Sequence, residues 1–198
     1  MGFLGEPLVR GTPINGQLSI SPYRIFGLEV GIDTFDKVRQ RLGSADLHGP
    51  GSKSEAPRFL PRFLCYVSTD ESDPTVIAFV SRSLDFFDQV TEVAVGQKKL
   101  LPQIVASCMK SKQVNANAVN IGILDLGISR QQFLGKVGPK TSYTDEERIA
   151  INFQLSKQRG QKENTLSDTV DTVFVTGILA HFTDDRLDWY RVYQANAY

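Results

Sequence analysis

The stretch Val30-Gly-Ile-Asp-Thr-Phe-Asp-Lys-Val-Arg-Gln-Arg-Leu-Gly43 recurs in altered form as Leu126-Gly-Ile-Ser-Arg-Gln-Gln-Phe-Leu-Gly-Lys-Val-Gly138. Each copy opens with Gly-Ile, continues with apolar residues at helical spacing and closes with glycine. Apolar side chains three or four positions apart share one face of a helix, and glycine commonly ends a helix. An internal repeat determines architecture far better than activity. The sequence therefore predicts two short helices, each opening a similar unit.

The first turn of each expected helix carries its own start signal. Asp33 precedes the first apolar residue of the earlier copy, and Asp36 follows three positions later. In the later copy Ser129 and Gln132 hold the same two positions. A short polar residue followed three positions later by an acid or amide is typical of a capping box. We therefore expect Asp33 and Ser129 to cap the two helices.

Extended segments follow each helix motif. Clean alternation of apolar and polar residues predicts a strand at residues 149–156, with a counterpart at 63–68 in the first half. Further strands are predicted at 76–81 and 90–95 in the first half, and at 172–182 and 187–193 in the second. Between the halves, residues 98–112 carry apolar side chains at helical spacing, with proline tolerable in the first turn. This segment is predicted to be a helix that joins the halves.

The predicted fold class is α+β, with two tandem helix-then-antiparallel-sheet repeats. Either the repeats pack side by side or they share one concave sheet. The expected division is an irregular lead-in (1–22), a first α+β repeat (23–97), a connecting helix (98–114) and a second α+β repeat (115–198).

Composition indicates an ordinary globular protein. The 198 residues include 22 Lys plus Arg and 22 Asp plus Glu, so no net charge draws the molecule toward nucleic acid. No run approaches the roughly 20 apolar residues that span a bilayer, and the N-terminus lacks the pattern of a signal peptide. Cys65 and Cys108 allow either one disulfide or two buried thiols.

The two helix motifs, together with the final Phe182-Thr-Asp-Asp-Arg-Leu187, resemble the tandem-repeat β-lactamase inhibitory protein family. That family is related to the small outer-membrane assembly lipoproteins. The resemblance implies a periplasmic or secreted protein that binds another protein and has no catalysis of its own. It also implies a concave sheet whose last two strands line the partner site, and the matching positions here are Leu179, His181, Trp189, Arg191 and Tyr193. The family carries a disulfide in each repeat, whereas the second half of this chain has no cysteine.

Strand alternation gives an independent view of the same surface. In the last strand Trp189, Arg191 and Tyr193 share one side, and an arginine is unfavourable in a helix-covered core. We therefore expect the Trp189 side to be the open face, with the composition of an interaction hot spot. Two alternatives stay open: Trp189 packs under the loop 157–171 while Arg191 pairs with Asp188 or Asp184, or the face pairs with a second copy in a homodimer.

Catalytic and metal sites are not expected. The two histidines, His48 and His181, and the two cysteines lack zinc-binding spacing, and a Cys65 nucleophile would need a histidine within hydrogen-bond reach. We expect no enzyme, no cofactor and no nucleic-acid partner.

The predicted function is a non-catalytic protein-binding module, inhibitor-like or for envelope assembly, that uses the sheet face and the hairpin loops 69–75 and 157–171. The alternative is a carrier of a small apolar ligand or lipid between sheet and helices. The expected location is periplasmic or secreted, with the cytoplasm left open.

Overall fold

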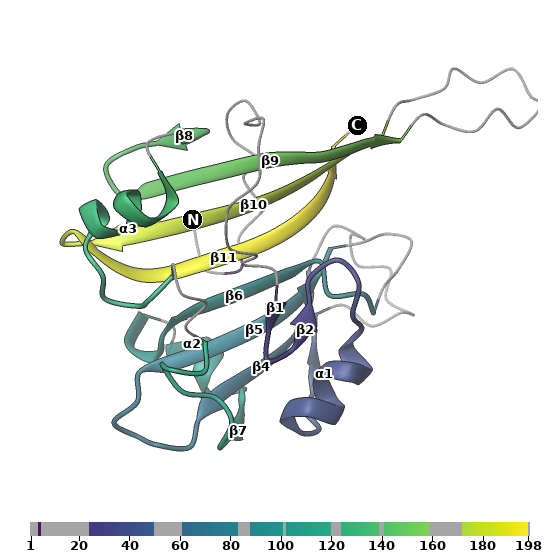
Figure 1. Ribbon diagram of the computed structural model, residues 1–198. Coiled ribbons are helices and arrows are strands. Elements are labelled where there is room, and N and C mark those ends of the chain that lie inside the picture. Colours follow the sequence, from purple (N-terminus) through teal and green to yellow (C-terminus); the bar gives the residue numbers. More distant parts are fainter. Residues whose placement is uncertain are drawn as a thin grey trace, which may run out of the picture.

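A computed structural model describes residue 4 and residues 24–49, 61–82, 88–100, 102–119, 124–138, 141–158 and 172–197 (Figure 1). Within these residues one sheet contains the strands β3 (Leu47–His48), β4 (Arg62–Ser68), β5 (Thr75–Ser81), β6 (Glu92–Gln97), β7 (Met109–Ser111), β8 (Tyr143–Thr144), β9 (Arg148–Gln158), β10 (Thr172–Thr183) and β11 (Arg186–Ala197). Their order is β3-β4-β5-β6-β11-β10-β9-β8, and β7 pairs in parallel with β4. All six predicted strands are present with shifted bounds: β6, predicted at 90–95, spans Glu92–Gln97, and β11, predicted at 187–193, spans Arg186–Ala197.

The remaining elements are short. A separate two-stranded sheet of β1 (Arg24–Ile25) and β2 (Leu28–Glu29) precedes the helix α1 (Phe35–Leu42). A 3-10 turn, η1 (Lys98–Leu100), and one turn of helix, α2 (Pro102–Val105), lead to β7, and α3 (Arg130–Val137) precedes β8. Both predicted repeat helices exist, and each has only 8 residues.

The predicted capping box of α3 is confirmed. Ser129 Oγ accepts a hydrogen bond from the backbone N–H of Gln132 at 3.2 Å, while the Gln132 side chain accepts one from the N–H of Ser129 at 2.9 Å. Two of the free N–H groups at the start of the helix are thereby satisfied. Gly138 ends the helix with a φ of 88°, a conformation that favours glycine.

The predicted cap of α1 is wrong. Thr34 holds the N-cap position and makes no side-chain cap bond. Asp33 does not cap the helix because its carboxylate is already used: it accepts hydrogen bonds from the backbone N–H of Glu29 at 2.8 Å and from Lys37 Nζ at 2.6 Å. The carboxylate therefore closes the turn before α1.

The predicted α+β class, with two helix-then-sheet repeats, is also wrong. The described residues form mostly antiparallel sheet, with few and short helices. The physical reason is that the helices are too short to form a layer of their own: α1 and α3 have 8 residues each, and the expected connecting helix is replaced by shorter elements that include β7. The predicted alternative of one shared sheet does hold, since β6 pairs with β11, with Val93 opposite Val192. The predicted lead-in, residues 1–22, lies outside the described residues except for Leu4.

The connecting helix predicted over residues 98–114 is replaced by η1, α2 and β7. Its apolar spacing reflects contacts with the sheet. Met109 pairs with Tyr66 of β4 in the ladder, and Cys108 forms a disulfide with Cys65 of the same strand. Tertiary pairing has overridden local helical preference here.

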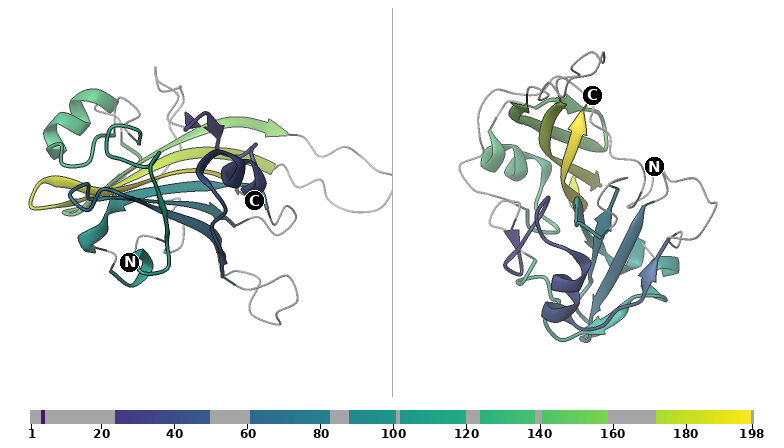
Figure 2. Two further views of the ribbon diagram at one scale, coloured as in Figure 1. Left: turned by 90° about the horizontal axis from the view of Figure 1, so that it is seen from below. Right: turned by 90° about the vertical axis from the view of Figure 1, so that its right-hand side faces the viewer.

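The sheet has apolar side chains on both faces. On the helix face, Phe35 and Val38 of α1 and Phe133 of α3 pack on side chains such as Tyr66 and Ile178. The opposite face is the Trp189 face, on which these apolar residues cluster: Cys65, Val67, Val76, Ala78, Val80, Ala94, Ala150, Leu179, Trp189 and Tyr193. Figure 2 shows α2 on the side opposite α3, in agreement with these two clusters. In the described part of the chain no helix has the length and apolar character that a membrane crossing needs.

Candidate partner-binding face

The predicted site residues lie together on the Trp189 face. Leu179 and His181 stand on β10, directly opposite Arg191 and Trp189 of β11, and Tyr193 stands opposite Gly177. Side chains on directly opposed residues of neighbouring strands point to the same face. The prediction that these positions share one surface is therefore confirmed by the register.

The expected exposure of this surface is wrong. Trp189 is 7% exposed, and Leu179, Arg191 and Tyr193 are fully buried, while His181 is partly exposed. The face is covered by short segments. Leu4, Ile104 and Val105 of α2, and Tyr143 of β8 pack against it. The loop 157–171, which was expected to contribute to the site, lies outside the described residues apart from the end of β9.

A buried ionic cluster crosses the face from Arg82, the residue after β5, to Arg191 of β11. Glu92 of β6 accepts from Arg191 through both carboxylate oxygens, with a distance of 2.8 Å from Arg191 Nη2 to Oε2. Arg82 Nε donates to the same Oε2, also at 2.8 Å. Two guanidinium groups thus share one carboxylate that is 1% exposed. Such a cluster is tolerated in an apolar setting only because its charges meet with close hydrogen-bond geometry.

The alternative in which Arg191 pairs with a carboxylate holds, but the carboxylate that it binds is Glu92 and not Asp188 or Asp184. The pairing of β11 with β6 brings Glu92 next to Arg191 although 99 residues separate them. A sequence signal existed, because Glu92 is a charged residue directly before the apolar run Val93-Ala-Val95 of β6. The strand order that uses it was not predictable from local periodicity.

His181 marks the partly exposed end of the face. Its ring stacks on the Trp189 indole, with centroids 4.9 Å apart and 10° between the planes. Its Nδ1 lies 2.8 Å from Oδ1 of the buried Asp188, whose other oxygen accepts from Thr183 Oγ1. Its Nε2 lies 3.6 Å from a carboxylate oxygen of Glu147. A donating Nδ1–H toward Asp188 fixes the ring over the indole, so the aromatic pair is held rigidly.

Elsewhere on the face two polar side chains meet above the backbone of Gly177, which lies between them in the sheet. Tyr193 Oη donates to Asn152 Oδ1, and both residues are buried. The phenol reaches Asn152 by crossing Gly177, where a methyl group would stand 2.5 Å from Tyr193 Oη and 2.6 Å from Asn152 Oδ1. Glycine at this position is required by that close approach.

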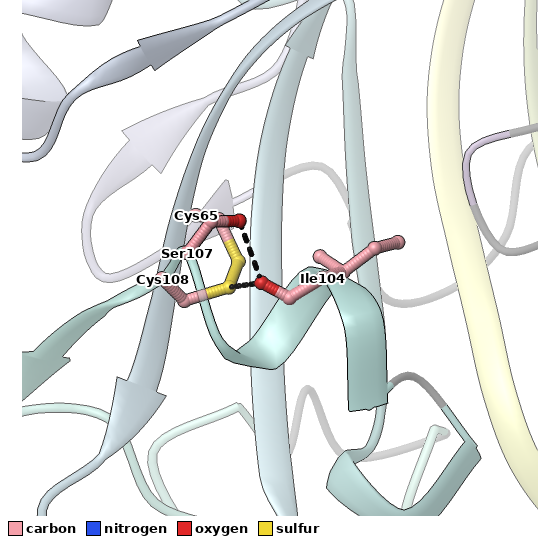
Figure 3. The surroundings of a disulfide bond; sticks show 4 residues. All are labelled: Cys65, Ile104, Ser107 and Cys108. Atoms are coloured by element: carbon pink, nitrogen blue, oxygen red, sulfur yellow. Dashed lines mark hydrogen bonds between the residues drawn. A yellow bond between two sulfur atoms is a disulfide. The ribbon is translucent and has the colours of Figure 1, made fainter.

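The disulfide joins β4 to the segment that covers the face (Figure 3). Cys65 and Cys108 are bonded, with their Cα atoms 4.7 Å apart, a usual separation for a disulfide. The carbonyl oxygen of Ile104 accepts from Ser107 Oγ at 2.8 Å and also lies 3.1 Å from Cys108 Sγ, a sulfur that carries no proton. The bond therefore holds α2, with Ile104 and Val105, against the sheet.

The loop 69–75 is held by hydrogen bonds to its aspartates, one of which comes from outside the loop. Asp70 accepts from the N–H and Oγ of Ser72, and Asp73 accepts from the N–H groups of Thr75 and Ala116. Burial alone would raise the pKa of Asp73, but these hydrogen bonds outweigh it and hold the pKa below its usual value. The acidic residues of this loop thus act as turn and tether groups.

No family model, curated protein or solved structure matches the sequence. The resemblance to the β-lactamase inhibitory protein family therefore stays a prediction, and so do the absence of catalysis and the homodimer.

Proposed function

We propose that the chain is a non-catalytic protein-binding module whose Trp189 face receives a segment of another protein. The observation that carries this proposal is the composition of the face. Aromatic residues and a buried Arg82–Glu92–Arg191 cluster stand on the side that α1 and α3 do not cover. Aromatic and arginine side chains dominate the energetics of protein interfaces.

The cover over the face supports the same function. Leu4 and α2 are short pieces from distant parts of the chain, and Tyr143 stands on β8 at the edge of the sheet itself. No second sheet lies on this side in the described residues. Contacts of this kind open locally at a lower free-energy cost than the strands beneath them. A partner segment can therefore exchange with part of the cover while the sheet stays intact.

The disulfide supports a location in the periplasm or outside the cell. A bond between Cys65 and Cys108 persists in an oxidising compartment and is rare in a reducing cytosol. The partner is then another protein of the same compartment. The alternative of an apolar-ligand carrier stays a prediction, and Phe35, Val38 and Phe133 pack in the space it would use between sheet and helices.

Site-specific photo-crosslinking tests the proposed function. Benzoylphenylalanine is placed at Phe63 or Tyr143, two half-buried aromatic residues that border the face, and at Ile32, which is 63% exposed in the turn before α1. The labelled proteins are irradiated with the envelope fraction of the source cells. We expect one partner to be joined to both Phe63 and Tyr143 and not to Ile32. A partner joined only through Ile32, or no adduct at either face position, would contradict the proposal.

A further inference from the structure

Leu4 is held on the Trp189 face by two different kinds of contact. Its side chain packs against the apolar cluster of that face. Its backbone carbonyl accepts a hydrogen bond from Arg82 Nη2 at 3.0 Å. Arg82 is the member of the ionic cluster nearest the surface, with a side chain that is 15% exposed. The face therefore already holds an aliphatic side chain and a main-chain oxygen together.

The Arg82 guanidinium is well placed to present this donor. Its Nε donates to Glu92, which fixes the plane of the group, and its Nη2 is directed to Leu4. Glu92 in turn is fixed by Arg191 on the central strand β11. A planar guanidinium held at one edge keeps its other N–H groups in a defined direction. The donor is thus preorganised by the sheet, and Leu4 is 78 residues distant along the chain.

We infer that the Leu4 position is the anchor subsite for the partner, and that Leu4 occupies it in the same chain until an extended partner segment replaces it. This inference rests on the proposed function and names the chemistry of the partner. The partner supplies an aliphatic side chain to the apolar cluster and its adjoining main-chain carbonyl to Arg82. Both contacts are of the type that Leu4 makes, so the two segments exclude one another.

Occupancy by the same chain lowers the apparent affinity for the partner. A segment tethered to its own site has an effective concentration in the millimolar range. The apparent dissociation constant for a competing segment is the intrinsic constant divided by the fraction of sites that the tethered segment leaves open. Loss of the Leu4 side chain should therefore strengthen binding of a competing segment by about tenfold for a site with an intrinsic dissociation constant near 0.1 mM.

The test uses a labelled peptide with the sequence of residues 1–10, Met-Gly-Phe-Leu-Gly-Glu-Pro-Leu-Val-Arg. Its binding to the full chain is measured by fluorescence anisotropy for wild type, Leu4→Asp and the control Ile32→Asp, which places the same charge at an exposed aliphatic residue. We expect binding to Leu4→Asp to be about tenfold tighter than to wild type and to Ile32→Asp. The same peptide with Asp in place of Leu4 and with Leu8 kept should bind none of them. Equal binding by all three chains, or binding that ignores the peptide's Leu, would overturn the inference.

The crosslinking yield separates this inference from the proposed function. If Leu4 competes with the partner, the adduct at Phe63 increases in the Leu4→Asp chain and falls when the peptide is added in excess. An adduct whose yield responds to neither change would leave the binding function standing and remove Leu4 from it. Circular dichroism of Leu4→Asp establishes that the sheet is intact, and Leu4→Ala provides a milder variant with the same expected direction.

Discussion

Gly177 shows how a single residue sets the geometry of the Trp189 face. We expect Gly177→Ala to lower the free energy of unfolding by about 1–3 kcal/mol, because the added methyl group would meet the Tyr193 phenol and the Asn152 amide. The matched control is Gly135→Ala in α3, where nothing lies within 4 Å of the added carbon. That change should stabilise the protein by about 0.5–1 kcal/mol, because alanine is the better helix residue. Urea denaturation measures the unfolding free energy of both variants. Equal changes for Gly177→Ala and Gly135→Ala would show that the Tyr193 side chain moves away from the added methyl group.

A second single residue on which stability depends is Glu92, the carboxylate that Arg82 and Arg191 share. Glu92→Gln removes the carboxylate that both guanidinium groups share while keeping its shape. We expect a loss of about 3–5 kcal/mol of unfolding free energy, the usual cost of removing one partner from a buried ion pair. Arg191→Met should cost less, because Glu92 then remains paired with Arg82. The order of the two losses, measured by urea denaturation, is the decisive result: a costlier Arg191→Met would mean that the cluster is held by packing.

At the scale of elements, the disulfide fixes α2 on the face. We expect replacement of Cys65 and Cys108 by serine to lower the unfolding free energy by about 2–4 kcal/mol, since the bond closes a loop across a sequence separation of 43. Thermal unfolding with and without dithiothreitol measures the effect. Dithiothreitol should lower the Tm of the wild type and leave the double variant unchanged. A thiol assay on the denatured, unreduced wild type should find no free thiol, and free thiols at both positions would refute the bond.

Elements differ in how far their sequence determines them. The strands and α3 follow from local patterns, namely the alternation of residues 149–156 and the Ser129–Gln132 capping box. Residues 98–114 satisfy a helical pattern equally well, yet the disulfide and the β4–β7 pairing draw them onto the sheet. Local periodicity cannot foresee this, because the competing partners lie on another strand.

For the candidate site too, the sequence predicts some features and not others: it predicts which side chains share a face, but not their burial or their ion pairing. Alternation placed Trp189, Arg191 and Tyr193 on one face because a strand's side chains alternate strictly. Their burial depends on Leu4 and α2, and the partner of Arg191 depends on where β6 pairs. Those are long-range contacts, which no local pattern specifies. The prediction of an open hot spot therefore identified the right side chains and the wrong exposure.

At the scale of the whole molecule, aspartates stabilise three separate turns, and one of them also binds a distant segment. Asp33 closes the turn before α1, Asp73 holds the loop 69–75 to Ala116, and Asp145 joins Tyr143 of β8 to Arg148 of β9. Burial raises the pKa of each, but the hydrogen bonds to Asp33, Asp73 and Asp145 outweigh it and hold every one of these pKa values below normal, that of Asp145 most strongly.

These lowered pKa values predict how stability depends on pH. An unfolded aspartate has a pKa of about 3.9, so each group contributes stability above that pH. The contribution is lost as the pH falls from there toward the lower pKa of the folded state, because protons then bind the unfolded chain more tightly. Urea midpoints measured from pH 7 to pH 2 should therefore fall steeply below about pH 4. Asp145→Asn should lower the urea midpoint at neutral pH and make its fall below pH 4 less steep. The reason is that it removes a carboxyl group whose pKa is lower in the folded state than in the unfolded state. A variant curve parallel to that of the wild type would show that the turn at β8 and β9 plays no part in acid unfolding.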